Sequence, residues 1–308
     1  MLRYSLRRLA GAIPTLFVVM TAAFFMMRLA PGGPFDRDRM LAPEVEANIR
    51  EAYNLDEPLV VQYGIYLSKL LRGDLGPSFR YQDYTVAELI GNGFPVSFRI
   101  GVTAILLALF VGAAFGIAAA LRQNSLLDHA VMAVAMIGIT VPNFVMAPLM
   151  ALIIGVYLRW LPAGGYGGGS LRNLVLPTIA LALPQIAYVA RLTRASMIEV
   201  LRSNYIRTAR AKGLPGRLVV GRHALRAALL PVVSYLGPAT AGIITGSVVI
   251  ETIFGIPGIG RYFVQGALNR DYTLVMGVVI FYGSLIIVLN LLVDLAYGLL
   301  DPKIRYDE

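Results

Sequence analysis

The sequence predicts an all-α membrane protein, and three observations support this fold class. Hydrophobic residues make up 57% of the 308 residues and charged residues only 15%. The mean hydropathy is +0.68, and these values do not describe a soluble domain. Uncharged apolar runs long enough to cross a bilayer also recur along the chain. We therefore expect most of the chain to lie in lipid.

Six apolar runs are candidates for transmembrane helices: 9–27, 100–121, 130–158, 173–190, 227–250 and 272–293. The run 173–190 is the shortest. The run 130–158 is the longest and must tilt, bend or extend beyond the hydrocarbon. The first run follows three arginines as a secretory signal would, but it is long for a signal and no small-residue cleavage pattern follows it. We expect it to be a retained span.

The basic residues predict the orientation in the membrane. Nine arginines and lysines and one acid, Glu199, lie in the loop 191–226. The positive-inside rule places this loop in the cytoplasm, and six spans then place both termini there too. The sequence predicts three parts: the cytoplasmic N-terminus and first span (1–29), an external module (30–98) and a five-span core (99–308) that contains this loop.

Residues 30–98 carry the signals of a folded module rather than of a disordered loop. Proline and acids at the start of 43–53 predict a helix, and a second helix is expected after Pro58. The segment 73–79 is a turn cluster, and Thr85 and Glu88 have the spacing of a capping box. The module is mildly acidic, which fits a docking surface but is more often a solvated face.

The basic loop contains the start and stop signals of a short helix. Asn204 is the expected N-cap, Arg210 and Lys212 lie near the C-terminal end, Gly213 is the stop signal and Pro215 follows. A charged helix between two spans is a suitable contact for a soluble partner. The alternative is that the basic residues only fix topology and contact anionic lipid, which is the better account for most of the nine.

Motifs of catalysis and of nucleic-acid binding are absent from the sequence. None of the three lysines (69, 212 and 303) lies in a Walker A sequence, and neither His129 nor His223 lies in a His-Glu-x-x-His zinc motif. No Gly-x-Ser-x-Gly motif occurs. The net charge is +9, but the largest basic cluster is tethered between two spans, whereas a DNA-binding domain needs its basic residues on one exposed surface. We expect no catalytic site, no bound metal and no nucleic acid.

The predicted spans contain small residues and a few polar ones. Gly112 and Gly116, and also Gly242 and Gly246, have the spacing that lets helices approach closely. Prolines interrupt the middle spans, and a broken helix exposes its backbone only to protein or to a watery path. The candidates for lining such a path are Asn143, Gln185, Ser234, Thr245, Ser247 and, near a span end where water can reach it, Glu251. For the uncharged candidates the alternative is a hydrogen bond to a neighbouring helix.

Ionisable residues are scarce inside the spans, and this bears on the source of energy. Ion-coupled carriers usually keep such groups, or an evident inverted repeat, near the membrane centre. Neither feature is found here. Energy for transport would therefore come from outside the bilayer, through the cytoplasmic loop. Two other classes stay open: a self-sufficient channel or ion-coupled carrier, and a membrane scaffold without transport.

Within the basic loop, Thr208-Ala209-Arg210-Ala211-Lys212-Gly213 resembles the coupling-loop motif in the permease subunits of ATP-binding-cassette (ABC) importers. Arg207-Thr208-Ala209 stands where the general motif has Glu-Ala-Ala. The peptide branch of the family has the form found here, including Arg222-His-Ala-Leu-Arg226 and Leu230-Pro231.

The resemblance extends over nearly the whole chain. It includes Ala12-Ile-Pro-Thr-Leu16, Phe25-Met-Met-Arg-Leu-Ala-Pro31, 73–79, 246–260, Asn269-Arg-Asp-Tyr272 and Asp301-Pro-Lys-Ile-Arg-Tyr306. The chain is similar to the B permease subunits of bacterial oligopeptide importers. Dipeptide, nickel and glutathione permeases share several of these motifs and remain alternatives.

The resemblance implies a type I ABC importer permease in a bacterial inner membrane. Its partners would be a second permease, two cytoplasmic ATPases that bind ATP and Mg²⁺, and an external solute-binding protein that delivers peptide. The chain itself would bind no cofactor. The residues that would contact an ATPase are Tyr205, Arg207, Thr208, Ala209, Arg210, Ala211, Lys212 and Gly213, with Ala209 and Gly213 expected to pack closely and the basic residues to make polar contacts.

Overall fold

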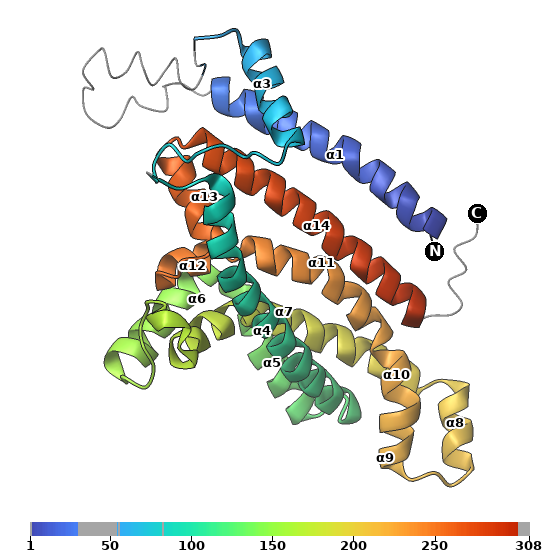
Figure 1. The fold of residues 1–308 in the computed structure, drawn as a ribbon. Helices are drawn as coiled ribbons and strands as arrows, with labels where there is room; N and C mark the ends of the chain where they lie inside the picture. Colours follow the sequence, from blue (N-terminus) through green and yellow to red (C-terminus); the bar gives the residue numbers. More distant parts are fainter. Residues whose placement is uncertain (1, 30–53, 55, 82, 301–308) are drawn as a thin grey trace. The chain divides into compact units, whose positions relative to one another are not determined.

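The computed structural model in Figure 1 describes residues 2–29, 54, 56–81 and 83–300, although the side chains of 2–9, 245–246 and 293–300 are not described. In this part of the chain all regular elements are helices, and Pro77 and Thr85 form one isolated β-bridge. The predicted all-α class is confirmed. The predicted helix at 43–53 lies outside the described residues.

The helices that carry the apolar runs are α1 (Leu2–Leu29), α4 (Val86–Leu121), α5 (Leu126–Thr140), α6 (Asn143–Met150), the π-helix η1 (Ala151–Tyr157), α7 (Leu171–Leu201), α11 (Leu230–Gly246) and α14 (Tyr272–Leu300). Shorter helices lie between them: α3 (Leu59–Leu71), the 3₁₀ turn η2 (Gly167–Gly169), α8 (Asn204–Ala211), α9 (Gly216–Leu218), the π-helix η3 (Val219–Ala224), α10 (Leu225–Ala228), α12 (Val248–Phe254) and α13 (Ile259–Leu268).

The six predicted runs correspond to four long helices and two bent pairs. Among the described residues, α1, α4, α7 and α14 each contain a stretch long and apolar enough to cross a membrane. The bent pairs are Leu126–Thr140 with Asn143–Tyr157, at 104°, and Gly216–Ala228 with Leu230–Ile244, at 46°. If each pair is one span, the total is six. The sharper bend falls at Pro142, because proline disfavours helical backbone in the residue before it.

Two predicted boundaries are corrected by the structure. Residues 191–201, expected to begin the cytoplasmic loop, continue helix α7. They include Ala, Met, Glu and Leu, which favour helix in water as well as in lipid. The run 227–250 is also not one helix, since α11 ends at Gly246 and α12 starts at Val248.

The chain forms two compact units. One consists mainly of Val96–Ile256, and the other of Leu2–Pro95 with Pro257–Ile287. In the second unit α3 packs on α1, where the Thr21 and Tyr63 hydroxyls lie 2.5 Å apart and Phe24 contacts the rings of Tyr63 and Tyr66. This contact places an apolar helix of the predicted external module against the first span.

A buried carboxylate organises the rest of the second unit. Asp271 precedes α14 and is fully buried. It accepts hydrogen bonds from Ser78 Oγ at 2.5 Å, the Arg80 N–H at 3.2 Å and the Leu274 N–H at 3.1 Å. An aspartate at this position caps the free N–H groups of a helix. Asp271 thus joins the turn at 73–79 to the start of α14.

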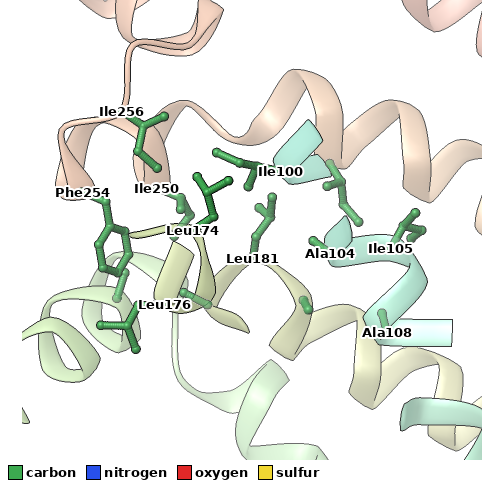
Figure 2. Close-up of a cluster of buried hydrophobic side chains, with 14 of the residues drawn as sticks. Ile100, Ala104, Ile105, Ala108, Leu174, Leu176, Leu181, Ile250, Phe254 and Ile256 are labelled. Carbon is green, nitrogen blue, oxygen red and sulfur yellow. The ribbon is translucent and has the colours of Figure 1, made fainter. Parts of the chain in front are cut away.

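The first unit is built around α7. Ile100, Ala104 and Ala108 of α4 pack with Leu174 and Leu181 of α7 and with Ile250 and Phe254 of α12, as Figure 2 shows. Such a core excludes water from the end of the unit that contains α12.

Small residues bring α4 and α5 onto the backbone of α7. A Cβ atom added at Gly112 would lie 2.8 Å from the Ile186 carbonyl oxygen, and one at Gly116 would lie 2.5 Å from the Ala190 oxygen. The predicted close packing of Gly112 and Gly116 is confirmed. Gly138 of α5 makes a similar approach, 2.3 Å from the Leu183 oxygen. Gly242 was expected to pack in the same way, but a Cβ there would meet no described atom within 4 Å.

Replacing Gly116 by alanine should destabilise the first unit. The added methyl would meet the α7 backbone, which has little room to move, and overpacking of this kind costs about 1–3 kcal/mol. Thermal denaturation of the purified protein would measure the loss. Gly242→Ala is the matched control, because it adds the same methyl to a helix where space is open. Equal melting temperatures for the two variants would contradict the packing argument.

Candidate coupling surface and membrane path

The short helix α8 lies at the end of α7 and beside the return helix formed by α9, η3 and α10, as Figure 1 shows. It begins one residue earlier than expected. Ser203 has extended backbone angles (φ −67°, ψ 155°) and is the N-cap, and its carbonyl accepts the Arg207 N–H at 3.2 Å. Asn204, the predicted cap, is instead the first helical residue.

Helix α8 ends in a Schellman motif. The Gly213 N–H donates to the Arg210 carbonyl at 2.9 Å, and the Leu214 N–H donates to the Ala209 carbonyl at 3.3 Å. Gly213 has a φ of +75°, a conformation in which a side chain is strained. The prediction that Gly213 ends the helix is confirmed. Within this chain no other described atom lies within 4 Å of its Cβ position, so here glycine is required by the positive φ and not by lack of space.

One face of α8 is anchored inside the chain. Ile206 is fully buried and Ala209 is 7% exposed, and both belong to an apolar cluster with Met197, Val219 and Ala224. The side chain of Ala209 therefore packs beneath α8 against the chain itself, not on the exposed face of the helix. Leu214 joins the same cluster and completes the hydrophobic contact that accompanies a Schellman motif.

The opposite face of α8 is exposed and basic. Tyr205 is 48% exposed, and the other exposed members of the predicted set are Arg207, Thr208, Arg210, Ala211, Lys212 and Gly213. Four further exposed arginines lie nearby, at positions 202, 217, 222 and 226. We call the exposed residues of 205–213 the α8 surface. Its charge and its single aromatic residue suit a partner that supplies acidic side chains around an apolar socket.

The predicted path residues do not form one cluster. Gln185 of α7 and Tyr235 of α11 meet, because the Tyr235 hydroxyl donates to Gln185 Oε1 at 2.6 Å. Ser234 donates to the Leu230 carbonyl of its own helix, which is neither a contact with a path nor the expected alternative of a bond to a neighbouring helix. Asn143 follows the bend at Pro142, and its buried Oδ1 has no hydrogen-bond partner in the described chain. The side chain of Thr245 is not described.

Glu251 and Ser247 are buried in the core rather than placed along a watery path. Both are fully buried, as is Ser97 of α4. Ser97 Oγ donates to Glu251 Oε1 at 2.6 Å, and Ser247 Oγ donates to the same oxygen. The expectation that water reaches Glu251 is wrong. Because α12 folds back against α6 and α7, the carboxyl group is covered by protein and joins α12 to α4.

A polar strip on α7 was missed by the sequence reasoning. Tyr188 lies between Gln185 and Arg191, with its ring 5.7 Å from the Tyr235 ring and 5.5 Å from the Arg191 guanidinium carbon. Residues 185, 188 and 191 are spaced by three, so they share one helix face. That spacing was the available signal, but Arg191 was assigned to the loop.

Among the described residues, no group of three metal-ligating side chains occurs.

Comparison with known families accounts for this architecture. Residues 112–306 match the family model described as the binding-protein-dependent transport system inner membrane component, and residues 1–101 match the N-terminal model of the same membrane components. The chain belongs to this permease family.

Permeases of known name resemble this one over their full length. The oligopeptide transport system permease protein OppB of Salmonella typhimurium is 56% identical over 306 residues, which cover 99% of this chain and 100% of the relative. OppB of Haemophilus influenzae is 52% identical over 306 residues, which again cover 99% of this chain and 100% of the relative. The dipeptide transport system permease protein DppB of Bacillus subtilis is 46% identical over 305 residues, or 99% and 98% of the two chains.

Solved structures with a similar fold come from ABC transporters. A chain of the inward-facing MetNI methionine ABC transporter aligns with a TM-score of 0.59 at 16% identity, covering 69% of this permease and 96% of that chain. A chain of an amino acid ABC transporter aligns with a TM-score of 0.51 at 16% identity, covering 71% and 95%. At this identity the likeness concerns the fold alone; together with the family match it confirms the predicted fold class of a type I ABC importer permease.

The hydroxyl groups around Glu251 yield a test of the buried cluster. Ser97→Ala removes one donor to a buried carboxyl group, and such a loss costs about 1–3 kcal/mol. The melting temperature of the permease should fall accordingly. Ser234→Ala is the control, because that hydroxyl donates only within its own helix in the described structure and its loss should be near neutral. A larger effect at Ser234 than at Ser97 would refute this account of Glu251.

Proposed function

We propose that this chain is a permease subunit of an ATP-driven importer of oligopeptides in a bacterial inner membrane. One observation carries the proposal: the 56% identity to oligopeptide permeases over essentially the whole of both chains. Dipeptide permeases match over the same length at 46% and 40% identity. A dipeptide importer is therefore the second candidate, within the same class of transporter.

The proposed topology has both termini and α8 in the cytoplasm. The basic residues support it, because most of those in 191–226 are exposed around α8 and the end of α7 and the positive-inside rule places such clusters on the cytoplasmic side. Residues 30–98 would then be the external module, and 99–308 the core that carries the coupling segment.

The proposed complex contains a second permease, two ATPases that bind ATP and Mg²⁺, and an external solute-binding protein. ATP hydrolysis is assigned to the ATPases, because the sequence of this chain has no Walker A motif. The role of this chain is to provide half of the path and to receive force from the ATPases. Peptide selection is assigned mainly to the binding protein.

The α8 surface is the proposed contact with an ATPase. Tyr205 would fill an apolar socket, while Arg207, Arg210 and Lys212 would pair with acidic side chains around it. Closure of the ATPases around ATP would move α8 and open the path outward. This requires tighter docking in one state than in the other, since a contact that is equally good in both states shifts no equilibrium. Ala209 contributes indirectly, by holding α8 on its cluster.

The polar strip of Gln185, Tyr188 and Arg191, with Tyr235, is the proposed part of the translocation path. Tyr188 is 37% exposed and Arg191 is exposed in the chain. Polar groups on a spanning helix face protein or water rather than lipid. Amide, phenol and guanidinium groups suit the amide and carboxylate groups of a peptide. Glu251 and Ser247 would stabilise α12 instead of contacting the substrate.

Variants of α8 test the coupling role. In the reconstituted complex, Tyr205→Ala should weaken docking by about 1–2 kcal/mol, or roughly tenfold, so peptide-stimulated ATP hydrolysis and uptake fall together. Gly213→Val should act similarly, because the side chain strains the left-handed residue that ends α8. Gly221→Val is the control: Gly221 lies on the return helix, has open space and does not have a positive φ. Normal uptake by both α8 variants would refute the coupling role.

The length of the transported peptide separates the two candidate substrates. Proteoliposomes containing the whole complex and its binding protein should take up peptides longer than dipeptides, with weak uptake of dipeptides. This expectation follows from the higher identity to oligopeptide permeases. Radiolabelled uptake, with affinities for the binding protein measured in parallel, provides the readout. Exclusive uptake of dipeptides would favour the second candidate.

A further inference from the structure

An ion pair joins α5 to α7 close to α8. Arg194 Nε donates to Asp128 Oδ1 at 2.6 Å, and Arg194 Nη2 donates to Asp128 Oδ2 at 2.7 Å. The Asn124 N–H also donates to Oδ2 at 2.9 Å. The Asp128 side chain is 1% exposed and that of Arg194 is 28% exposed. A bidentate pair of this kind fixes direction as well as distance.

Stability alone does not explain such a pair. Removing charges from water is costly, and an apolar pair of similar volume is often as stable or more so. The best-attested use of a buried ion pair is to fix register. The interface here needs one, since α5 and α7 pack mainly through small side chains, Ala135 against Ala187 and Ala190 with Ile139 at the edge, and through Gly138 on the α7 backbone. Smooth surfaces without interlocking side chains offer little resistance to sliding.

The pair also stands at the point where α7 joins α8. Residues 194–201 form about two turns of helix, after which Ser203 caps α8. Met197, one turn beyond Arg194, belongs to the cluster under Ile206. Arg202 Nη2 donates to Gln123 Oε1 at 3.1 Å, so the segment before α5 is tied to α7 a second time.

From this end, α5 leads toward the other end of the unit. It bends by 104° into α6, and α6 packs against α12, which holds Glu251. The chain thus has two routes from α8 to the buried Glu251 cluster: one along α7, and one through α5 and α6. The α5 part of the second route follows a movement of α7 only if α5 keeps its register on α7, although α6 also contacts α7 directly.

We propose that Asp128 and Arg194 are positioning residues for energy coupling: they fix the register of α5 on α7, so that a displacement at α8 moves both helices as one body. This inference rests on the proposed function. In this proposal the ion pair affects the amount of peptide transported per ATP hydrolysed. It does not contact the peptide or the ATPase.

The test compares coupling with stability in the whole reconstituted complex. The double variant Asp128→Leu with Arg194→Met removes both charges and leaves no unpaired one, so it should assemble and melt near the wild type. Peptide transported per ATP hydrolysed should fall by about fivefold or more, which is the low end of typical coupling energies between sites. Arg194→Lys, which keeps the charge but loses the bidentate geometry, should give an intermediate ratio.

Thr193→Val is the matched control. Thr193 lies beside Arg194, is fully buried, and its hydroxyl has no partner in the described chain, so this variant perturbs α7 without touching the pair. It should keep the wild-type ratio. The proposal is overturned if the double variant or Arg194→Lys transports at the wild-type ratio, or if the ratio falls only in proportion to melting temperature. Uncoupling by Tyr205→Ala without uncoupling by the pair variants would refute this inference and leave the proposed function intact.

Discussion

The close approach of helix backbones around α7 is the constraint on which the rest of the first unit depends. Gly112 and Gly116 of α4 and Gly138 of α5 leave no space for a methyl group against the α7 carbonyls. In lipid no hydrophobic force holds helices together, so association depends on packing contacts made at short range. This packing makes α7 the axis of the unit and carries it past the apolar run to the base of α8. The position of the α8 surface follows from it.

Buried polar groups fix the positions of helices along and around their axes, which packing of small residues alone does not determine. Asp128 and Glu251 are buried acids near helix ends, and each receives donors from a distant segment. A buried polar group in an apolar surrounding is tolerated only when it is hydrogen-bonded. Each acid therefore favours one arrangement of its helices, since a displacement would remove the donor from the distant helix. The glycines set how closely the helices approach, and the acids set the position along and around each axis.

The fold class, the six apolar runs and the position of α8 could be predicted because each depends on local composition. Gly112 and Gly116 were found because their spacing is a local signal, whereas Gly138 has no such partner and was missed. The continuation of α7 to Leu201 was missed because charged residues end an apolar run without ending a helix. Asp128 meets Arg194 across 66 residues, and Ser97 meets Glu251 across 154. No periodicity in the sequence links residues so far apart. The burial of Glu251 could therefore not be predicted, and this residue was wrongly expected to be exposed to water.

The α8 surface illustrates how one short helix serves two requirements. Its inner face, Ile206 and Ala209, must be rigidly attached if force is to reach α7, and both residues are buried against the end of that helix. In the proposed coupling role its outer face binds a partner that changes state, and there the side chains are exposed and mostly charged. Charged surface contacts weaken steeply with distance and screening, so they release readily, whereas the apolar attachment persists. The boundary between faces runs along α8 itself, which is why a motif of eight residues can specify both.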